Sequence, residues 1–216
     1  NGGAIGVTVA GEIANLFMAW WDKTFIEKIN SENIVIKMYT RYVDDETVIC
    51  KSINKTENNT SINEKDDERT MKKLQQIANS IHPSIELTID YPSNHENGRL
   101  PILDTEQWIE TVEINNEFKP QVLYSHYTKP MASKRVIHHD SAISDRSKTN
   151  ILIADLVRIM KNISIKRTQI ERRKKIQEYI TRMQFSGYSK QERANVYVRA
   201  KKKYEIMVNQ DISKVQ

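Results

Sequence analysis

Two adjacent carboxylates, Asp44 and Asp45, are the residues of this chain best suited to chemistry. They lie between two runs of strand-forming residues, 34–43 and 47–50, and such runs around an acidic pair predict a β-hairpin with both acids at its turn. Neighbouring aspartates repel each other at neutral pH, so a cation that binds both is their natural partner. The pair is therefore a candidate metal site. Aspartate is also a common turn residue without any further role, which is the alternative interpretation.

The hairpin needs supporting elements, and hydrophobic periodicity predicts them. Apolar residues return every three or four positions from Ile13 to Ile29, which is typical of an amphipathic helix. Residues 52–70 are polar and lack a period, so they predict a surface loop. Further elements are expected in this order: a helix over 71–81 that ends before His82-Pro83, a strand over 85–89, and a second hairpin of strands 100–113 and 121–128 with a turn at Asn115-Asn116 and an end at Pro130.

From Asp145 onward the pattern is entirely helical. Three helices are predicted over 145–163, 165–185 and 191–207, with Asp145 as the N-cap of the first. Gly187 is expected to end the second helix and Ser189 to cap the third. The fold class expected is α+β, with β-hairpins packed on helices over residues 1–140 and an all-α basic module over 141–216.

The composition limits the class of protein. With 216 residues, of which 38% are hydrophobic and 28% charged, the chain is long enough for one large domain or two small ones. No stretch approaches the ~18 apolar residues of a membrane span, and a single cysteine, Cys50, excludes a disulfide framework and a cysteine-based zinc site. These properties indicate a soluble, intracellular protein. The start at Asn1-Gly2-Gly3, without an initiator methionine, suggests a piece of a longer protein.

The net charge of +5 conceals an asymmetry between the two ends of the chain. Residues 1–150 hold 17 Lys or Arg and 22 Asp or Glu, a net charge of −5, whereas residues 151–216 hold 16 and 6, a net charge of +10. Basic side chains that neutralise phosphates release counterions, so the C-terminal helices are suited to binding a polyanion such as nucleic acid. The alternative is an ordinary solvated helical surface.

Three stretches, in this order, resemble the reverse transcriptase family, and most closely its Penelope-like retroelement branch. Gly2-Gly3-Ala4-Ile5-Gly6, leading to Ala14-Asn15-Leu16-Phe17-Met18, is similar to the palm motif in which a glycine turn opens a long helix. Arg41-Tyr42-Val43-Asp44-Asp45 resembles the Tyr-x-Asp-Asp hairpin of that palm. Gly98-Arg99-Leu100-Pro101-Ile102-Leu103-Asp104, followed by Tyr127-Thr128-Lys129-Pro130, is similar to the Leu-Pro-x-Leu-Asp and Tyr-x-Lys-Pro elements of the branch. The chain departs from the family at Val7-Thr8 and Ala10-Gly11, where Ser-Pro pairs are common.

The resemblance implies an RNA-directed DNA polymerase, with a partial palm over residues 1–140 and a thumb over 141–216. Such enzymes transfer a nucleotidyl group to a primer 3′-hydroxyl with two Mg²⁺ ions about 3.5 to 4 Å apart. By the same resemblance, Asp44 and Asp45 are catalytic metal ligands, and Gly3, Gly6 and Tyr42 bind nucleotide and template. A further aspartate of this class lies on a strand upstream of the glycine motif, which is absent here. We therefore expect this piece alone to have little or no polymerase activity.

The implied partners are an RNA template, a DNA primer and a dNTP. Tyr127 and Lys129 correspond to the primer grip, and the run Arg172 to Lys175 also resembles a nuclear-localisation patch, so a nuclear location is one expectation. Contacts with nucleic-acid phosphates, which do not read sequence, are expected from basic residues of the second and third C-terminal helices: Lys166, Arg167, Arg172, Arg173, Lys174, Lys175, Arg199, Lys201, Lys202 and Lys203.

Two other functions are compatible with these residues. One is a non-catalytic nucleic-acid-binding remnant of a retroelement, and the other is an RNA-directed RNA polymerase, which uses the same kind of acidic pair. A third feature, His138-His139-Asp140, contains metal-binding residue types but lacks a third well-spaced ligand, so it is not expected to hold a metal.

Overall fold

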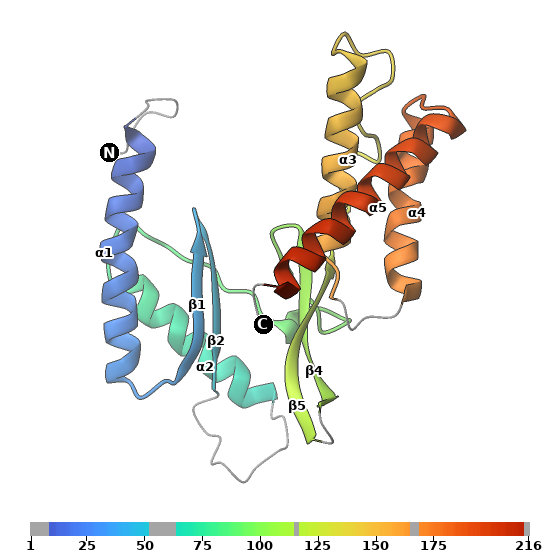
Figure 1. Ribbon diagram of the computed structural model, residues 1–216. Helices are drawn as coiled ribbons and strands as arrows, with labels where there is room; N and C mark the ends of the chain where they lie inside the picture. The colour runs from blue at the N-terminus through green and yellow to red at the C-terminus, as the bar shows by residue number, and fades with distance from the viewer. Residues whose placement is uncertain (1–8, 52–63, 115–116, 165–168, 214–216) are drawn as a thin grey trace. The chain divides into compact units, whose positions relative to one another are not determined.

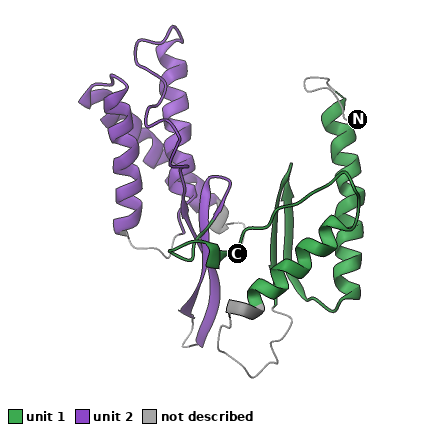
Figure 2. Ribbon diagram, turned by 180° about the vertical axis from the view of Figure 1, so that it is seen from behind, with its two compact units in different colours: residues 1–100 green, residues 101–216 purple. Residues whose placement is uncertain are grey.

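The computed structural model describes residues 9–51, 64–114, 117–164 and 169–213. The chain divides into two compact units, residues 1–100 (unit 1) and residues 101–216 (unit 2), shown in different colours in Figure 2. The described elements are five α-helices, one 3-10 helix and two small sheets, which confirms the α+β class. The expected division into functional domains at residue 140 falls inside unit 2, and it stays a prediction.

Unit 1 is built around one antiparallel hairpin, as the sequence predicts. Helix α1 (Ala10–Ser31) leads into strands β1 (Ile36–Tyr42) and β2 (Asp45–Cys50), which pair from Ile36 opposite Cys50 to Tyr42 opposite Asp45 (Figure 1). Helix α2 (Glu64–Asn79) and a short 3-10 helix, η1 (Pro92–Asn94), follow. Only two residues, Val43 and Asp44, separate the strands, so the acidic pair is fixed at the tip of the hairpin.

The core of unit 1 lies between the two helices and one face of the hairpin. Helix α1 buries Trp21, Phe25 and Ile29, which recur every four residues, and the rings of Trp21 and Phe25 stack with their centroids 4.9 Å apart. Alternate residues of the strands face this core, and they include Tyr39 and Val48. Helix α2 completes the cluster with Leu74, Ile77 and Ala78.

Two predictions for unit 1 are wrong. Residues 64–70 belong to α2 instead of the expected loop, while residues 52–63 of that loop lie outside the described part of the chain. Residues 85–89 are not a strand of either sheet. The Leu87 N–H donates to the Asn79 Oδ1 at 2.7 Å, and the Leu87 carbonyl accepts from Gln75 Nε2 at 2.9 Å. Side chains of α2 thus make the hydrogen bonds to the Leu87 backbone that a neighbouring strand would otherwise make.

The sheet of unit 2 has the strand order β3-β4-β5. Strand β3 (Leu100–Ile102) begins at the boundary of the units, and β4 (Thr105–Ile114) pairs with the antiparallel β5 (Glu117–His126), with Trp108 opposite Leu123. The single strand expected over 100–113 is therefore two strands, because a turn at Leu103-Asp104 interrupts it. The expected turn at Asn115-Asn116 lies outside the described residues.

Three helices form the main core of unit 2: α3 (Asp145–Lys161), α4 (Gln169–Phe185) and α5 (Lys190–Ser213). The N-cap of α3 is Ser144, whose Oγ accepts from the Ser147 N–H at 3.3 Å, so the expectation of Asp145 was one residue late. Ser189 caps α5 as predicted and exchanges hydrogen bonds of 2.8 and 3.3 Å with Glu192. Gly187, with φ of 90°, follows the end of α4.

Helices within the described ranges are too short or too polar to cross a lipid bilayer.

Candidate functional site

The turn that carries the acidic pair exposes both carboxylates. Asp44 is its second residue and Asp45 is the first residue of β2, and both side chains are exposed to solvent. Among the described residues, none forms a hydrogen bond or ion pair with either carboxylate. Their oxygen atoms are therefore available to an external partner.

The backbone of this turn is strained at Val43. Its φ of 59° lies in the left-handed region, where a β-branched side chain clashes with its own backbone. A two-residue hairpin turn with a positive φ at its first residue usually has glycine there. Strain of this kind persists only where the surroundings impose it, and it clusters at functional sites. Here the Arg41 Nη1 donates to the Val43 carbonyl at 2.8 Å and helps to hold the turn.

An ion pair beneath the turn links the hairpin to α1. Asp22 of α1 accepts from the Tyr39 hydroxyl at 2.6 Å, and both of its carboxylate oxygens lie 3.0 Å from the Arg41 Nε. The Arg41 and Asp22 side chains are only 13% and 21% exposed, so this pair is shielded from solvent more than a surface salt bridge. Arg41 thus connects the helix and the strained turn through one side chain.

Glu46 lies next to Asp45 in sequence but on the opposite face of β2. Burial raises the pKa of the Glu46 carboxyl to about 7, and the nearby Asp22 carboxylate adds to this effect while Arg41 opposes it. Burial and the hydrogen bond to Asp22 also raise the pKa of Tyr39 well above its usual value. The covered face of the hairpin therefore contains a polar cluster of four residues: Asp22, Tyr39, Arg41 and Glu46.

This cluster was not among the residues expected at the site, although the sequence contains signals for it. Asp22 follows Trp21 on the side of α1 that faces the core, where a carboxylate needs a partner. Tyr39 and Arg41 alternate along β1, and the pairing of Arg41 with Glu46 follows directly from a two-residue turn.

The acidic pair fits one divalent cation in donor type, but it does not supply enough donors for a two-metal site. Carboxylates are the ligands that Mg²⁺ prefers, and it usually takes one or two from the protein. A two-metal site needs more ligands, yet the described residues contain no group of three His, Cys, Asp or Glu side chains that could hold a metal ion. If Asp44 and Asp45 belong to a two-metal centre, another carboxylate must come from outside the described residues.

The other residues expected at the catalytic site are only partly described. Tyr42 lies beside the turn and is 64% exposed. Gly3 and Gly6 lie outside the described residues. Tyr127 and Lys129 follow the end of β5 and are not part of the hairpin itself; the Tyr127 N–H donates to the Asp104 carbonyl at 2.9 Å, and Lys129 is exposed.

The basic residues of α4 and α5 have different environments. Arg172 donates to the Ile163 carbonyl at 3.2 Å and lies over the Tyr204 ring, with 5.4 Å to its centroid, so this side chain stabilises the packing of the helices. Lys201 forms an ion pair with Glu205 at 3.7 Å. Lys166 and Arg167 lie outside the described residues. The remaining expected contacts are exposed or half-buried positions of the two helices: Arg173, Lys174, Lys175, Arg199, Lys202 and Lys203.

The side chains of His138-His139-Asp140 are engaged with protein groups. His139 bonds to Asp140 through Nδ1 at 2.8 Å, and its Nε2 lies 3.3 Å from a Glu192 carboxylate oxygen. The hydrogen bond to Asp140 raises the pKa of His139. Both ring nitrogens are thus directed at carboxylates, which gives this segment a role in attaching the loop before α3 to α5.

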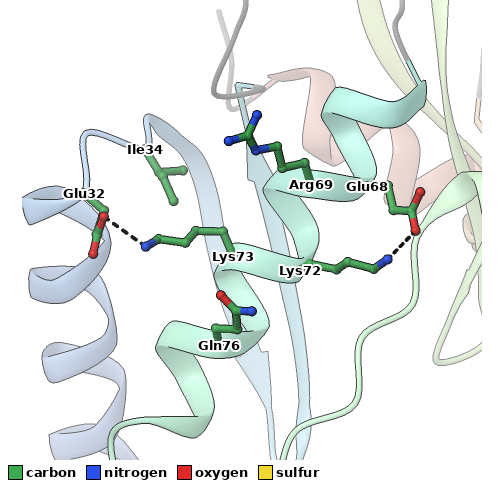
Figure 3. Close-up of a pocket in the computed structure, with 7 residues that line it drawn as sticks. All are labelled: Glu32, Ile34, Glu68, Arg69, Lys72, Lys73 and Gln76. Atoms are coloured by element: carbon green, nitrogen blue, oxygen red, sulfur yellow. Dashed lines mark ion pairs between the residues drawn. The ribbon is translucent and has the colours of Figure 1, made fainter.

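A shallow pocket of about 540 Å³ lies on α2 and near the end of α1 (Figure 3). Two of its three cations are paired with carboxylates, Lys73 with Glu32 at 3.2 Å and Lys72 with Glu68 at 2.6 Å. The lining includes neither Asp44 nor Asp45, so the candidate metal site is the exposed turn and not this pocket.

Comparison with known proteins gives no relative for this arrangement, since no family model, no curated protein and no solved structure matches the chain.

Proposed function

We propose that this chain is part of a retroelement reverse transcriptase, an RNA-directed DNA polymerase in which Asp44 and Asp45 are catalytic metal ligands. The observation that carries the proposal is the two-residue turn between β1 and β2. It exposes two adjacent carboxylates without partners among the described residues, and it holds Val43 at a φ of 59°. A β-branched residue at this φ costs free energy that glycine or asparagine would avoid, and the free carboxylates distinguish this turn from others in the described part of the chain.

The proposed reaction is attack of a primer 3′-hydroxyl on the α-phosphate of a dNTP, with release of pyrophosphate. Mg²⁺ bound at the site would supply the positive charge that favours the deprotonated hydroxyl and the leaving group. The chain supplies the ligands Asp44 and Asp45, and the Asp22–Arg41 pair keeps the hairpin in place. The further carboxylate comes from a residue outside the described ranges, and the proposed reaction requires it.

The remaining elements have supporting roles in this proposal. Unit 1 provides the part of the palm with the acidic turn, and α3 to α5 correspond to the thumb. The exposed cations of α4 and α5 bind phosphates of the RNA–DNA duplex without reading its sequence. The net charge of +10 over residues 151–216 supports this division.

The experiment is a primer-extension assay with poly(rA)/oligo(dT), dTTP and Mg²⁺. It uses a protein that joins this chain to a segment carrying the further carboxylate. Incorporation is expected to fall to background with Asp44→Asn, whereas Asp104→Asn, a change in a second two-residue turn, should retain activity. If Asp44→Asn incorporates dTTP as well as the parent, the metal-ligand assignment is wrong. Preference for UTP over dTTP would instead indicate an RNA-directed RNA polymerase.

A non-catalytic remnant that binds nucleic acid is the second candidate. It is favoured by the lack of a three-ligand group among the described side chains. This candidate predicts salt-dependent binding of the hybrid duplex with no dependence on Mg²⁺ and no effect of Asp44→Asn. The reverse transcriptase predicts that Mg²⁺ binding is lost in that variant.

A further inference from the structure

A second shallow pocket, of about 460 Å³, lies on α4. Helix residues at positions 174, 177, 178, 181, 182 and 185 line it, and this spacing of three and four places them on one face of the helix. Lys134, from the loop before α3, lines the other side. The whole pocket belongs to unit 2.

Buried hydrogen bonds fix the loop that carries Lys134. Ser186, fully buried after the last residue of α4, accepts from the Val136 N–H at 3.0 Å and donates to the Arg182 carbonyl at 2.9 Å, so its hydroxyl joins the loop to α4. The Ser186 carbonyl also accepts from the His139 N–H at 2.9 Å. Lys134 is two residues from this attachment, so the backbone that carries it is held beside the end of α4.

Three cations and an exposed aromatic ring share this pocket. Lys134, Lys174 and Arg182 outnumber the single carboxylate, Glu178, and Phe185 is 65% exposed. Arg182 also acts on His126, a buried side chain of β5 that does not line the pocket. Burial lowers the pKa of His126, the Asp104 carboxylate opposes this effect, and the cations Lys175, Arg158 and Arg182 add to it.

This combination matches the chemistry of an unpaired nucleotide. Lys and Arg bind phosphate oxygens through charge-assisted hydrogen bonds, and an exposed aromatic side chain stacks on a base that is free of its duplex partner. Bases inside a duplex already stack on each other, so Phe185 discriminates in favour of a single strand.

The length of the site distinguishes a strand from a free nucleotide. From Lys174 to Phe185 the helix rises by about 16 Å. Successive phosphates are about 3.4 Å apart along a duplex strand and farther apart along an extended single strand, so this row of side chains spans more than one linked nucleotide. A mononucleotide would occupy only one end.

We propose that this pocket binds a single-stranded segment of nucleic acid, with phosphates against Lys134, Lys174 and Arg182 and a base stacked on Phe185. The inference rests on the nucleic-acid-binding part of the proposed function and adds a site for an unpaired strand, which shares only Lys174 with the proposed duplex contacts. The ligand is recognised by charge and stacking, without sequence readout.

The test measures binding of the full chain to a fluorescent twelve-nucleotide oligo(dT) and to a labelled poly(rA)/oligo(dT) duplex. Phe185→Ala should weaken oligo(dT) binding about tenfold, because stacking of one base is lost, and it should leave duplex binding unchanged. Phe118→Ala is the matched control, since Phe118 is an exposed phenylalanine of the same unit, 75% accessible, and outside the pocket. The unfolding midpoint of each variant establishes that it is folded.

A direct spectroscopic readout complements the affinities. In Phe185→Trp, oligo(dT) should quench the added indole fluorescence by stacking, whereas Phe118→Trp should not be quenched. The inference would be overturned if Phe185→Ala weakened the binding of oligo(dT) and of the duplex equally, or if it did not weaken oligo(dT) binding. So would competition by dTMP or polyglutamate as effective as that by oligo(dT).

The outcomes also separate this inference from the proposed function. If duplex binding depends steeply on salt but Phe185→Ala does not change oligo(dT) binding, only the proposed single-strand site is wrong. Absence of binding to both nucleic acids overturns the pocket together with the nucleic-acid contacts of the proposed thumb.

Discussion

The molecule contains two turns of the same local design, Val43-Asp44 in unit 1 and Leu103-Asp104 in unit 2. Each joins two strands through two residues, and each places an aliphatic residue at positive φ, 59° for Val43 and 54° for Leu103, before an aspartate. Their aspartates differ. Asp104 accepts from the Asn162 Nδ2 at 2.7 Å and lies 3.6 Å from the Arg158 Nε, whereas no described side chain contacts the Asp44 carboxylate.

The difference shows that the residues around a turn determine whether its aspartate is bonded within the protein or available to a ligand. Asn162 follows α3, so the Asp104 carboxylate connects the sheet of unit 2 to its helices. The Asp44 turn is instead fixed through its backbone and through Arg41, which leaves its carboxylate free. One turn is thus structural, and the other is suited to an external ligand.

The largest expected effect is on stability and separates the two aspartates. Asp104→Ala should lower the free energy of unfolding by about 1–2 kcal/mol, because the partly buried Asn162 amide loses its acceptor. Asp44→Ala should change it by less than about 0.5 kcal/mol, as expected for an exposed side chain without partners. Urea unfolding followed by circular dichroism measures both.

Asp104→Asn is the control for this comparison, since it retains an oxygen acceptor for Asn162 and should lose less stability than Asp104→Ala. Equal destabilisation by the Asp44 and Asp104 variants would contradict the distinction between the turns.

Glycine substitutions compare the strain of the two turns. Val43→Gly should stabilise the chain by about 1 kcal/mol, because relief of a strained φ exceeds the entropy that glycine adds to the unfolded state. Leu103→Gly should raise the free energy of unfolding by less, since leucine is not β-branched. Val43→Ala retains a Cβ and should gain less than Val43→Gly. A loss of stability in Val43→Gly would show that the valine side chain contributes more than its strain costs.

The pH dependence of unit 1 distinguishes Glu46 from its neighbour Asp45. The folded-state pKa of Glu46, about 7, lies above its ordinary value of 4.5, so its contribution to stability is complete below pH 4.5 and is lost as the pH rises through 7. Solvent screening limits this loss to about 1 kcal/mol. Glu46→Gln should remove this loss, and Asp45→Asn should retain it. Unfolding midpoints from pH 4 to pH 8 measure the effect, and a parent-like profile for Glu46→Gln would contradict it.

The smallest effect concerns single lysines of the two units. Lys202→Ala on α5 should reduce the salt slope of duplex binding by about 1, the value of one phosphate contact. Lys73→Ala should leave the slope unchanged, because Lys73 lies in unit 1 and is paired with Glu32. Fluorescence anisotropy between 50 and 200 mM salt, the range over which such contacts weaken, measures both slopes. An unchanged slope for Lys202→Ala removes that residue from the proposed phosphate contacts.

Local patterns in the sequence were sufficient to predict the first hairpin and most helices. The apolar period of α1, the β-rich runs around Asp44-Asp45 and the Ser189 cap each depend on residues within a few positions. The prediction failed where distant side chains replace backbone pairing. Residues 85–89 alternate like a strand, but Gln75 and Asn79 of α2 satisfy the Leu87 backbone.

The candidate site shows the same limit. Its carboxylates belong to two adjacent residues and could be predicted from the sequence. The Asp22–Arg41 pair instead joins residues 19 positions apart and depends on how α1 packs on the hairpin. The turn at Leu103-Asp104 was also missed, because an aliphatic residue at positive φ has no signal in a sequence that otherwise favours a continuous strand.

Mn²⁺ titration of the ¹⁵N-labelled chain measures whether a divalent cation binds at the Val43-Asp44 turn. Paramagnetic broadening should begin at the backbone amide signals of residues 43–46, leave those of residues 103–105 sharp, and disappear in Asp44→Asn but not in Asp104→Asn. Broadening that is equal at both turns, or that persists unchanged in Asp44→Asn, would contradict the assignment of Asp44 as a metal ligand.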